Sequence, residues 1–180
     1  MKSEVSLNKA NRLINSGHIV LVTSAFEKKV NIATIAWSTP VSHTPALLAI
    51  SVAKKHYTAE LIQSSYEFIV NIPTFDLLEQ VLLCGAQSGR TVDKFAATKL
   101  TVGKSHCLEH TPLIEECIGH IECRVKQAMD SGDHFLFVAE PVYASACADS
   151  FDGVWNTEKA RLIFHCGGRF FASLHQQQEV

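Results

Sequence analysis

Short apolar runs, separated by polar and turn-forming residues, dominate the first half of the chain. Four of them are rich in valine, isoleucine and alanine and have the length of strands. The predicted strands are His18–Ser24, Val30–Trp37, Ala46–Val52 and Glu67–Ile72.

Three segments of the first half have helical spacing instead. Apolar residues predict an opening helix over Val5–Asn15, with Gly17 just past its end. Tyr57–Ser64 is predicted as a second helix. The sequence Asp76-Leu-Leu-Glu79 resembles a capping box and predicts a third helix that ends at Gly85.

The second half follows a strand pattern more clearly. Over Ile118–Val125, Ile121, Cys123 and Val125 alternate with His120, Glu122 and Arg124, which predicts one buried face and one solvent-facing face. His134–Tyr143 and Arg161–Phe164 continue the pattern, and Pro141 suits a bulge or an edge.

The order of these elements predicts the fold class. Strands outnumber helices and mostly follow one another directly, which favours a mainly β protein, an antiparallel β-barrel with flanking helices, over a doubly wound parallel sheet. The 180 residues are close to the usual size of one domain, so residues 1–180 are predicted to form a single domain.

Composition and charge exclude several classes of function. The net charge of −2 comes from 16 basic and 18 acidic residues spread along the chain, so we expect no nucleic-acid partner. The longest apolar runs are far shorter than the ~20 residues that span a bilayer, so we expect no membrane segment. The N-terminal residues lack the apolar core of a secretory signal, which predicts a cytoplasmic protein. The six cysteines are therefore expected to be reduced and buried.

Histidines and cysteines do not form a convincing metal or nucleophile motif. His106 and His110 have the spacing of a zinc-binding helix, but Thr111-Pro112 follows at once, so we expect a solvated loop. No C-x2-C pair occurs, and no metal site is predicted. Cys84 would need a histidine base that no nearby residue supplies, and we interpret it as a small buried side chain near a turn.

Two segments have more distinctive chemistry. Ser88, Gly89, Arg90 and Lys94 have the side chains and the turn to hold a phosphate, although the same residues also occur in ordinary exposed loops. The predicted strand Asn31–Trp37 has Asn31 and Trp37 on one face and Thr34 on the other, and the Trp37 indole needs a hydrogen-bond partner.

Six segments, in this order, resemble the flavin reductase-like family of FMN-binding split barrels, and within it the flavoredoxin-like branch. The similarity extends over about residues 15–150. The segments are Asn31–Pro40, Pro45–Val52, His56–Ile62, Phe68–Pro73, Cys84–Phe95 and Gly132–His134.

The resemblance implies an FMN site near the interface of a homodimer. Around the flavin ring and ribityl chain it places Asn31, Thr34, Ile35, Ala36, Trp37, Ser51 and Val52. The phosphate would be held by Thr58, Arg90 and Lys94, with Lys54 as a further helper. His134 would approach the ring, without any protein nucleophile, and Phe164 or the Phe170-Phe171 pair would cover the flavin face.

The implied reaction is hydride transfer from NADH or NADPH to FMN, followed by electron transfer onward. Some family members serve as reductase components for a separate monooxygenase, and others are electron carriers reduced by a redox partner. A split barrel that has lost its flavin is a third alternative. The sequence does not distinguish NADH from NADPH, because no dinucleotide fingerprint is present.

Overall fold

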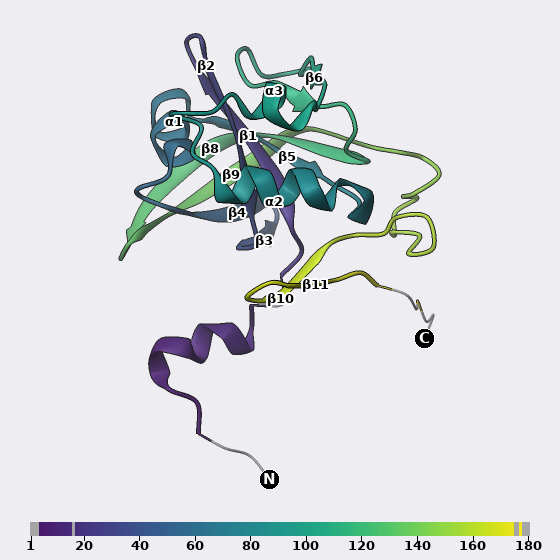
Figure 1. Cartoon of the computed structure of the whole chain (residues 1–180). Helices are drawn as coiled ribbons and strands as arrows, with labels where there is room; N and C mark the ends of the chain where they lie inside the picture. Colours follow the sequence, from purple (N-terminus) through teal and green to yellow (C-terminus); the bar gives the residue numbers. More distant parts are fainter. Residues whose placement is uncertain (1–3, 16, 175–176, 178–180) are drawn as a thin grey trace.

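The computed structural model describes residues 4–15, 17–174 and 177. Within them, one seven-stranded antiparallel sheet has the order β2-β1-β5-β8-β9-β4-β3 (Figure 1). Its strands are β1 (Val20–Phe26), β2 (Lys29–Ile35), β3 (Ser38–His43), β4 (Ala46–Ala53), β5 (Glu67–Ile72), β8 (Gly119–Ser131) and β9 (His134–Ala146). Two small ribbons pair β6 (Val102–Gly103) with β7 (Leu113–Ile114), and β10 (Phe164–Gly167) with β11 (Phe170–Ala172).

The connection between the two edge strands makes the sheet curl. β2 and β3 lie at opposite edges of the sheet, yet only Ala36 and Trp37 separate them in sequence. The Ser51 amide of β4 also donates to the Trp37 carbonyl (2.9 Å). The two edges must therefore approach each other, as in a barrel that is split on one side, and the predicted mainly β, antiparallel fold class is confirmed.

Helices flank this sheet, and α1 packs against the cluster inside the barrel while α2 packs against a second cluster. α2 lies across the strands, α1 and α3 are at one end, and a short 3-10 helix, Phe75–Leu77, leads into α2 (Figure 1). The helices are α1 (Tyr57–Ser65), α2 (Leu78–Ala86) and α3 (Lys94–Thr98).

β1 is buried on both faces and so belongs to two apolar layers. Val20 and Val22 point into one cluster, which includes Phe68, Phe137 and part of α1. Ile19 before the strand and Leu21 within it belong to a second cluster, which includes Val81 and Cys84 of α2. Alternate side chains of a strand point to opposite faces, so the continuous apolar run of β1 fits between two layers.

Most predicted elements are present with small shifts at their ends. β5 has the predicted bounds, and Val142 is the extra residue of a bulge beside Pro141, as expected. Arg161–Phe164 was predicted as a strand, but only Phe164 belongs to β10. β3 was not predicted, because Pro40 reads as a break; it is tolerated because β3 is an edge strand.

Glu122 corrects the predicted burial pattern of β8. It was expected to face solvent, but it is fully buried. Its carboxylate accepts hydrogen bonds from the amides of His106 (2.6 Å), Cys107 (2.7 Å) and Leu108 (3.1 Å). A buried carboxylate is stable where several N–H groups satisfy it, so Glu122 holds the 105–110 loop against the sheet.

That loop contains the histidine pair with zinc-like spacing. It has no helix, in agreement with the expected loop. Among the described residues, no group of three or more His, Cys, Asp and Glu side chains is arranged to hold a metal ion. None of the six cysteines forms a disulfide within the described chain. Cys84, Cys117 and Cys123 are buried and the other three are exposed, so the expectation of buried thiols holds for half of them.

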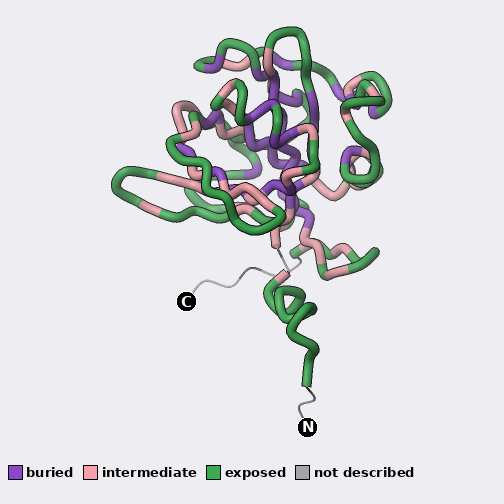
Figure 2. Tube along the Cα trace, turned by 90° about the vertical axis from the view of Figure 1, so that its left-hand side faces the viewer, coloured by how far each residue is buried: buried purple, intermediate pink, exposed green. Residues whose placement is uncertain are grey.

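The N-terminal segment projects from the body of the molecule (Figures 1 and 2). The predicted opening helix is a 3-10 helix over Leu7–Leu13 that buries none of its residues. Leu7 is 92% exposed and Ile14 is 86% exposed, so its apolar side chains find no core within the described chain. No helix in the described residues is long and apolar enough to cross a membrane.

Candidate functional site

Two adjoining cavities lie where β2 passes the start of α1. The larger, here called the polar chamber, has a volume of about 240 Å³ and is lined by Asn31, Ala33, Thr34, Lys55, His56, Tyr57, Thr58, Cys84, Gly85, Ala86, Gln87, Ser88, Gly89 and Lys94. The smaller, the aromatic chamber, has a volume of about 170 Å³ and is lined by Thr34, Ile35, Ala36, Trp37, Ser51, Ala53, His56 and His134. Thr34 and His56 line both.

The start of α1 gives the polar chamber its preference for anions. His56 is the N-cap residue, and no side chain of the described part of the chain caps the helix. The amides of Tyr57 and Thr58 are in the first turn, where a helix has no internal acceptors for its N–H groups. These N–H groups and the helix dipole together favour a negatively charged ligand.

Asn31 reaches into the chamber from β2. Its Nδ2 donates to Oγ1 of Thr58 (2.8 Å), which joins β2 to the first turn of α1. Its Oδ1 is buried and has no hydrogen-bond partner among the residues that the structure describes. Buried polar atoms are normally satisfied, so this oxygen points to a ligand with a hydrogen-bond donor.

Gly89 packs directly against Asn31. A Cβ atom at position 89 would lie 2.0 Å from Oδ1 of Asn31, far inside van der Waals contact. Only glycine lets the 87–93 loop approach β2 this closely, and the approach shapes the wall of the polar chamber.

Lys94 lies at the bottom of the polar chamber. It is only 5% exposed, and its Nζ donates to the carbonyl oxygens of Ile32 (2.6 Å) and Cys84 (2.7 Å). Burial lowers the pKa of Lys94 from its usual value. An ammonium group has three donors, so one remains for a ligand.

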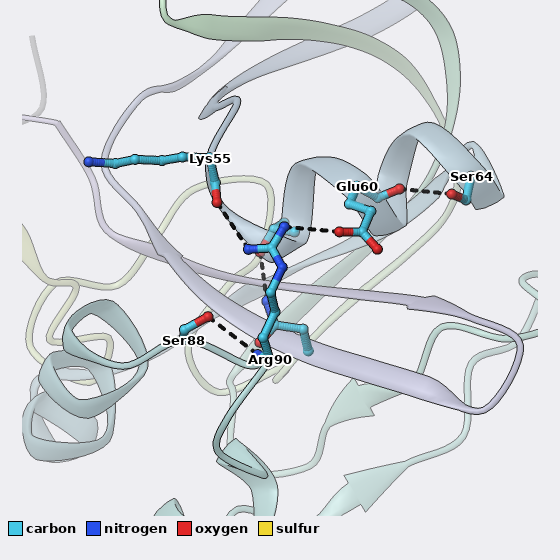
Figure 3. Close-up of polar contacts among 7 residues, drawn as sticks. Lys55, Glu60, Ser64, Ser88 and Arg90 are labelled. Carbon is cyan, nitrogen blue, oxygen red and sulfur yellow. Dashed lines mark hydrogen bonds and ion pairs between the residues drawn. The ribbon is translucent and has the colours of Figure 1, made fainter.

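Arg90 does not line either chamber, which differs from its expected place at the phosphate. Its guanidinium donates to the Lys55 carbonyl (3.0 Å) and to the Glu60 carboxylate (2.9 Å), as Figure 3 shows. It also lies 5.1 Å from the centre of the Tyr57 ring. Arg90 therefore ties the 87–93 loop to α1 and positions two walls of the polar chamber.

Two rings form one side of the aromatic chamber. Trp37 and His134 pack with their ring centres 5.0 Å apart, and Trp37 is 41% exposed. The indole nitrogen donates to Oδ1 of Asn15 (2.7 Å), the partner that the sequence left open. Nδ1 of His134 pairs with Asp133 (2.6 Å), and this hydrogen bond lowers the pKa of the Asp133 carboxyl.

The structure brings most of the expected site residues together. Those that line one of the chambers are Asn31, Thr34, Ile35, Ala36, Trp37, Ser51, Thr58, Lys94 and His134. Asn31 and Thr34 were expected on opposite faces of the strand, yet both border the polar chamber. The hydroxyl of Thr34 is already engaged, because it donates to the Val81 carbonyl (2.5 Å).

Three other expected residues lie outside both chambers. Val52 is buried in the barrel core, and Lys54 pairs with Asp130 (2.7 Å). Phe164 packs on His18, with ring centres 5.6 Å apart. The Phe170-Phe171 pair likewise lies in β11, where Phe171 contacts His165.

Sequence reasoning missed two residues of the site, Lys55 and His56. Both immediately precede α1, and both line the polar chamber. The signal that could have identified them is their position, because residues just before a helix flank its anion-binding end. The lysine chosen instead, Lys54, is one position earlier and points to the β8–β9 turn.

Cys84 borders the polar chamber but is not an activated nucleophile. Burial raises the pKa of its thiol to about 11, so the thiolate is scarce near neutral pH. This agrees with its interpretation as a small buried side chain.

Comparisons with known proteins agree with this fold. The reductase component of a 4-nitrophenol 4-monooxygenase/4-nitrocatechol 2-monooxygenase from Rhodococcus opacus is 30% identical over 128 residues, which are 71% of this chain and 65% of that protein. Flavoredoxin from Methanosarcina acetivorans superposes with a TM-score of 0.89 at 24% identity, covering 100% of this chain and 95% of the other. An FMN-binding protein from Thermus thermophilus superposes with a TM-score of 0.83 at 21% identity, covering 100% and 98%.

The family model of the flavin reductase like domain matches residues 12–168, which contain every residue of both chambers. The match extends over most of the chain, from the end of the N-terminal 3-10 helix to the β10–β11 hairpin. The chain therefore belongs to the flavin reductase-like family, and it resembles the flavoredoxin branch.

Proposed function

We propose that this protein binds FMN across the two chambers and acts as a flavin oxidoreductase that takes hydride from NADH or NADPH. The observation that carries the proposal is the direct contact of a cationic chamber with an aromatic one, joined at Thr34 and His56. This arrangement suits a ligand with a phosphate at one end and a flat ring at the other.

The polar chamber fits a phosphate. Among the described residues that line the two chambers, Lys55 and Lys94 are cationic and none is acidic. The first turn of α1 adds backbone donors, and the unpartnered Oδ1 of Asn31 can accept from a ribityl hydroxyl. A single chamber of this kind favours a mononucleotide such as FMN, and the likeness to an FMN-binding protein supports the same choice.

The aromatic chamber fits the ring. Ile35, Ala36 and Trp37 provide apolar surface for a flat ring. Bound FMN would supply the two-electron chemistry, accepting hydride from a reduced nicotinamide.

The side chains of the protein would orient and enclose the bound FMN. Asp133 accepts a hydrogen bond from His134, whose imidazole packs against the Trp37 ring and lines the aromatic chamber. Asn31 and Lys94 would hold the phosphate end of the FMN in the polar chamber. Positioning of this kind brings a hydride donor to reacting distance without any protein nucleophile.

An electron carrier is the second candidate function. The similarity in fold to a flavoredoxin favours it, because such a protein would receive electrons from a protein partner and not from a nicotinamide. The reductase component from Rhodococcus opacus supports the first candidate and suggests a monooxygenase as the acceptor of the reduced flavin.

The visible spectrum of the purified protein tests the proposal directly. We expect oxidised-flavin bands, as purified or after FMN is added, and bleaching of these bands when NADH or NADPH is added without oxygen. Bands that persist with both nucleotides would support the electron carrier. A colourless protein that also ignores added FMN would contradict both candidates.

Tryptophan fluorescence, measured on the same samples, tests whether the flavin ring lies in the aromatic chamber. The chain has only two tryptophans, so the Trp155→Phe variant reports on Trp37 alone. FMN should quench this fluorescence, because Trp37 lines the aromatic chamber. Unquenched fluorescence with FMN bound would place the ring elsewhere.

A further inference from the structure

His56 occupies the junction of the two chambers and is held there by its backbone. Its amide donates to the Ala53 carbonyl (2.9 Å), and its own carbonyl accepts from the Ala59 amide (3.1 Å). Thr34 is the other residue that both chambers share, but its hydroxyl is bound to Val81. The His56 imidazole makes no hydrogen bond within the described chain, so it remains available to a ligand.

The groups that face His56 are mostly cationic. Lys55 precedes it, Arg90 comes from the 87–93 loop, Lys94 from α3 and His134 from β9. Burial, followed by these four groups, lowers the pKa of His56 below its usual 6.5.

Negative charge near His56 is scarce. Cys84 on α2 keeps its proton, Glu60 is paired with Arg90, and Asp133 is paired with His134 at the surface. Neither carboxylate lines a chamber. Without a ligand, His56 is therefore a neutral imidazole near pH 7 in a positive environment.

We propose that His56 takes up a proton from solvent when a phosphorylated ligand enters the polar chamber, so that binding of the ligand is coupled to protonation of this residue. The coupling rests on the proposed function, because FMN would bring the phosphate. A phosphate carries between one and two negative charges near neutral pH and supplies the counter-charge that the described residues lining the chambers do not provide.

The direction of the pH dependence follows from linkage. Phosphate raises the pKa of His56 from its lowered value, so the complex holds more protons than the free protein between the two values. Affinity for FMN must therefore increase as the pH falls through that window. The phosphate itself binds its second proton near pH ~6, so measurements from about pH 7.5 to pH 8.5, where it is almost fully deprotonated, separate the two titrations.

Calorimetric titration of the full chain with FMN measures the proton directly. Repeating it at one pH in two buffers of different ionisation enthalpy gives the number of protons taken up. We expect uptake by the wild type with FMN, and none with riboflavin, which has no phosphate. His56→Gln should abolish the uptake and weaken FMN binding several-fold at about pH 7.5, with less effect at about pH 8.5.

Two further variants test whether the proton is taken up by His56 itself. His56→Lys carries a permanent charge, so it should bind FMN without proton uptake. His110→Gln removes an exposed histidine of the 105–110 loop and should behave as the wild type. Proton uptake that persists in both His56 variants would overturn the proposal and leave FMN binding intact. A wild type that binds no FMN would instead overturn the proposed function, and the coupling with it.

Discussion

His18 is a partly buried histidine whose protonation opposes folding. It lies just before β1 against Phe164, and its Nε2 is buried without a hydrogen-bond partner in the described chain. Burial lowers the pKa of His18 to about 4, compared with 6.5 for a free side chain. The imidazole therefore stays neutral in the folded protein until the pH falls toward about 4.

This shift predicts a loss of stability in mild acid. Between pH 6.5 and about 4 the unfolded chain binds a proton at His18 that the folded chain does not, so stability falls as the pH falls through this window. The full effect is about 3 kcal/mol in the free energy of unfolding. Replacing His18 with leucine removes it.

Urea denaturation at about pH 7.5 and about pH 4.5 measures the difference. We expect His18→Leu to gain stability relative to the wild type at the lower pH, and His110→Gln, an exposed control, to follow the wild type. Parallel losses in the wild type and His18→Leu would show that His18 titrates normally.

At the scale of elements, the site depends on how the 87–93 loop is tied to α1. Arg90 makes this connection through Lys55 and Glu60 (Figure 3). Both side chains of the ion pair are about half exposed, and exposed pairs add little to global stability. Their effect should be local, on the shape of the polar chamber.

Arg90→Gln is therefore expected to weaken flavin binding more than folding. The free energy of unfolding should fall by less than about 1 kcal/mol, while bound FMN dissociates several-fold faster. Arg161→Gln is a matched control, because Arg161 pairs with Asp76 (3.3 Å) and lies over the Phe75 ring in a similar way. Stopped-flow release of FMN compares them, and equal release rates in the two variants would contradict the positioning role of Arg90.

Elements with a clear period could be predicted from the sequence, and those set by long-range contacts could not. β5 and α1 have almost their predicted bounds, because apolar spacing and flanking turns define them locally. The strand alternation of β8 was recognised, but Glu122 was assigned to solvent, since its three amide partners come from a loop 14 to 16 residues away. A tertiary contact of this kind leaves no trace in the local pattern.

The candidate site was predictable to a similar extent. The β2 segment and Thr58, expected at the flavin, border a chamber, whereas Arg90 and Lys54 lie outside both chambers and their place at the phosphate stays a prediction. Both are cations near a phosphate-sized cavity, and a sequence does not show that each already has a carboxylate partner. Lys54 and Lys55 are the same residue type, but Lys55 lines the polar chamber while the Lys54 side chain pairs with Asp130.

At the scale of the whole molecule, the described chain divides into a two-layered body and an N-terminal arm. The 3-10 helix Leu7–Leu13 contributes nothing to either apolar layer (Figure 2). Deleting residues 1–13 should therefore change the free energy of unfolding by less than about 0.5 kcal/mol.

Thermal or urea denaturation of the shortened chain checks this expectation. Ile163→Ala is a positive control for a large effect, because Ile163 is fully buried in the apolar cluster beneath α2. Its truncation should lower the free energy of unfolding by about 2–5 kcal/mol. A large loss on deleting the arm would mean that it packs against something outside the described monomer. Asn15, the partner of Trp37, remains in the shortened chain.

The two chambers also draw on a short stretch of the chain. Every lining residue lies between Asn31 and Lys94 except His134, which β9 brings back beside Trp37. Relatives could therefore vary much of their second half outside β8 and β9, as natural recombination or a designed chimera would, and keep the same cavity provided these strands and His134 are retained. A family built in this way can diversify the surfaces that meet other molecules while the inherited pocket stays the same.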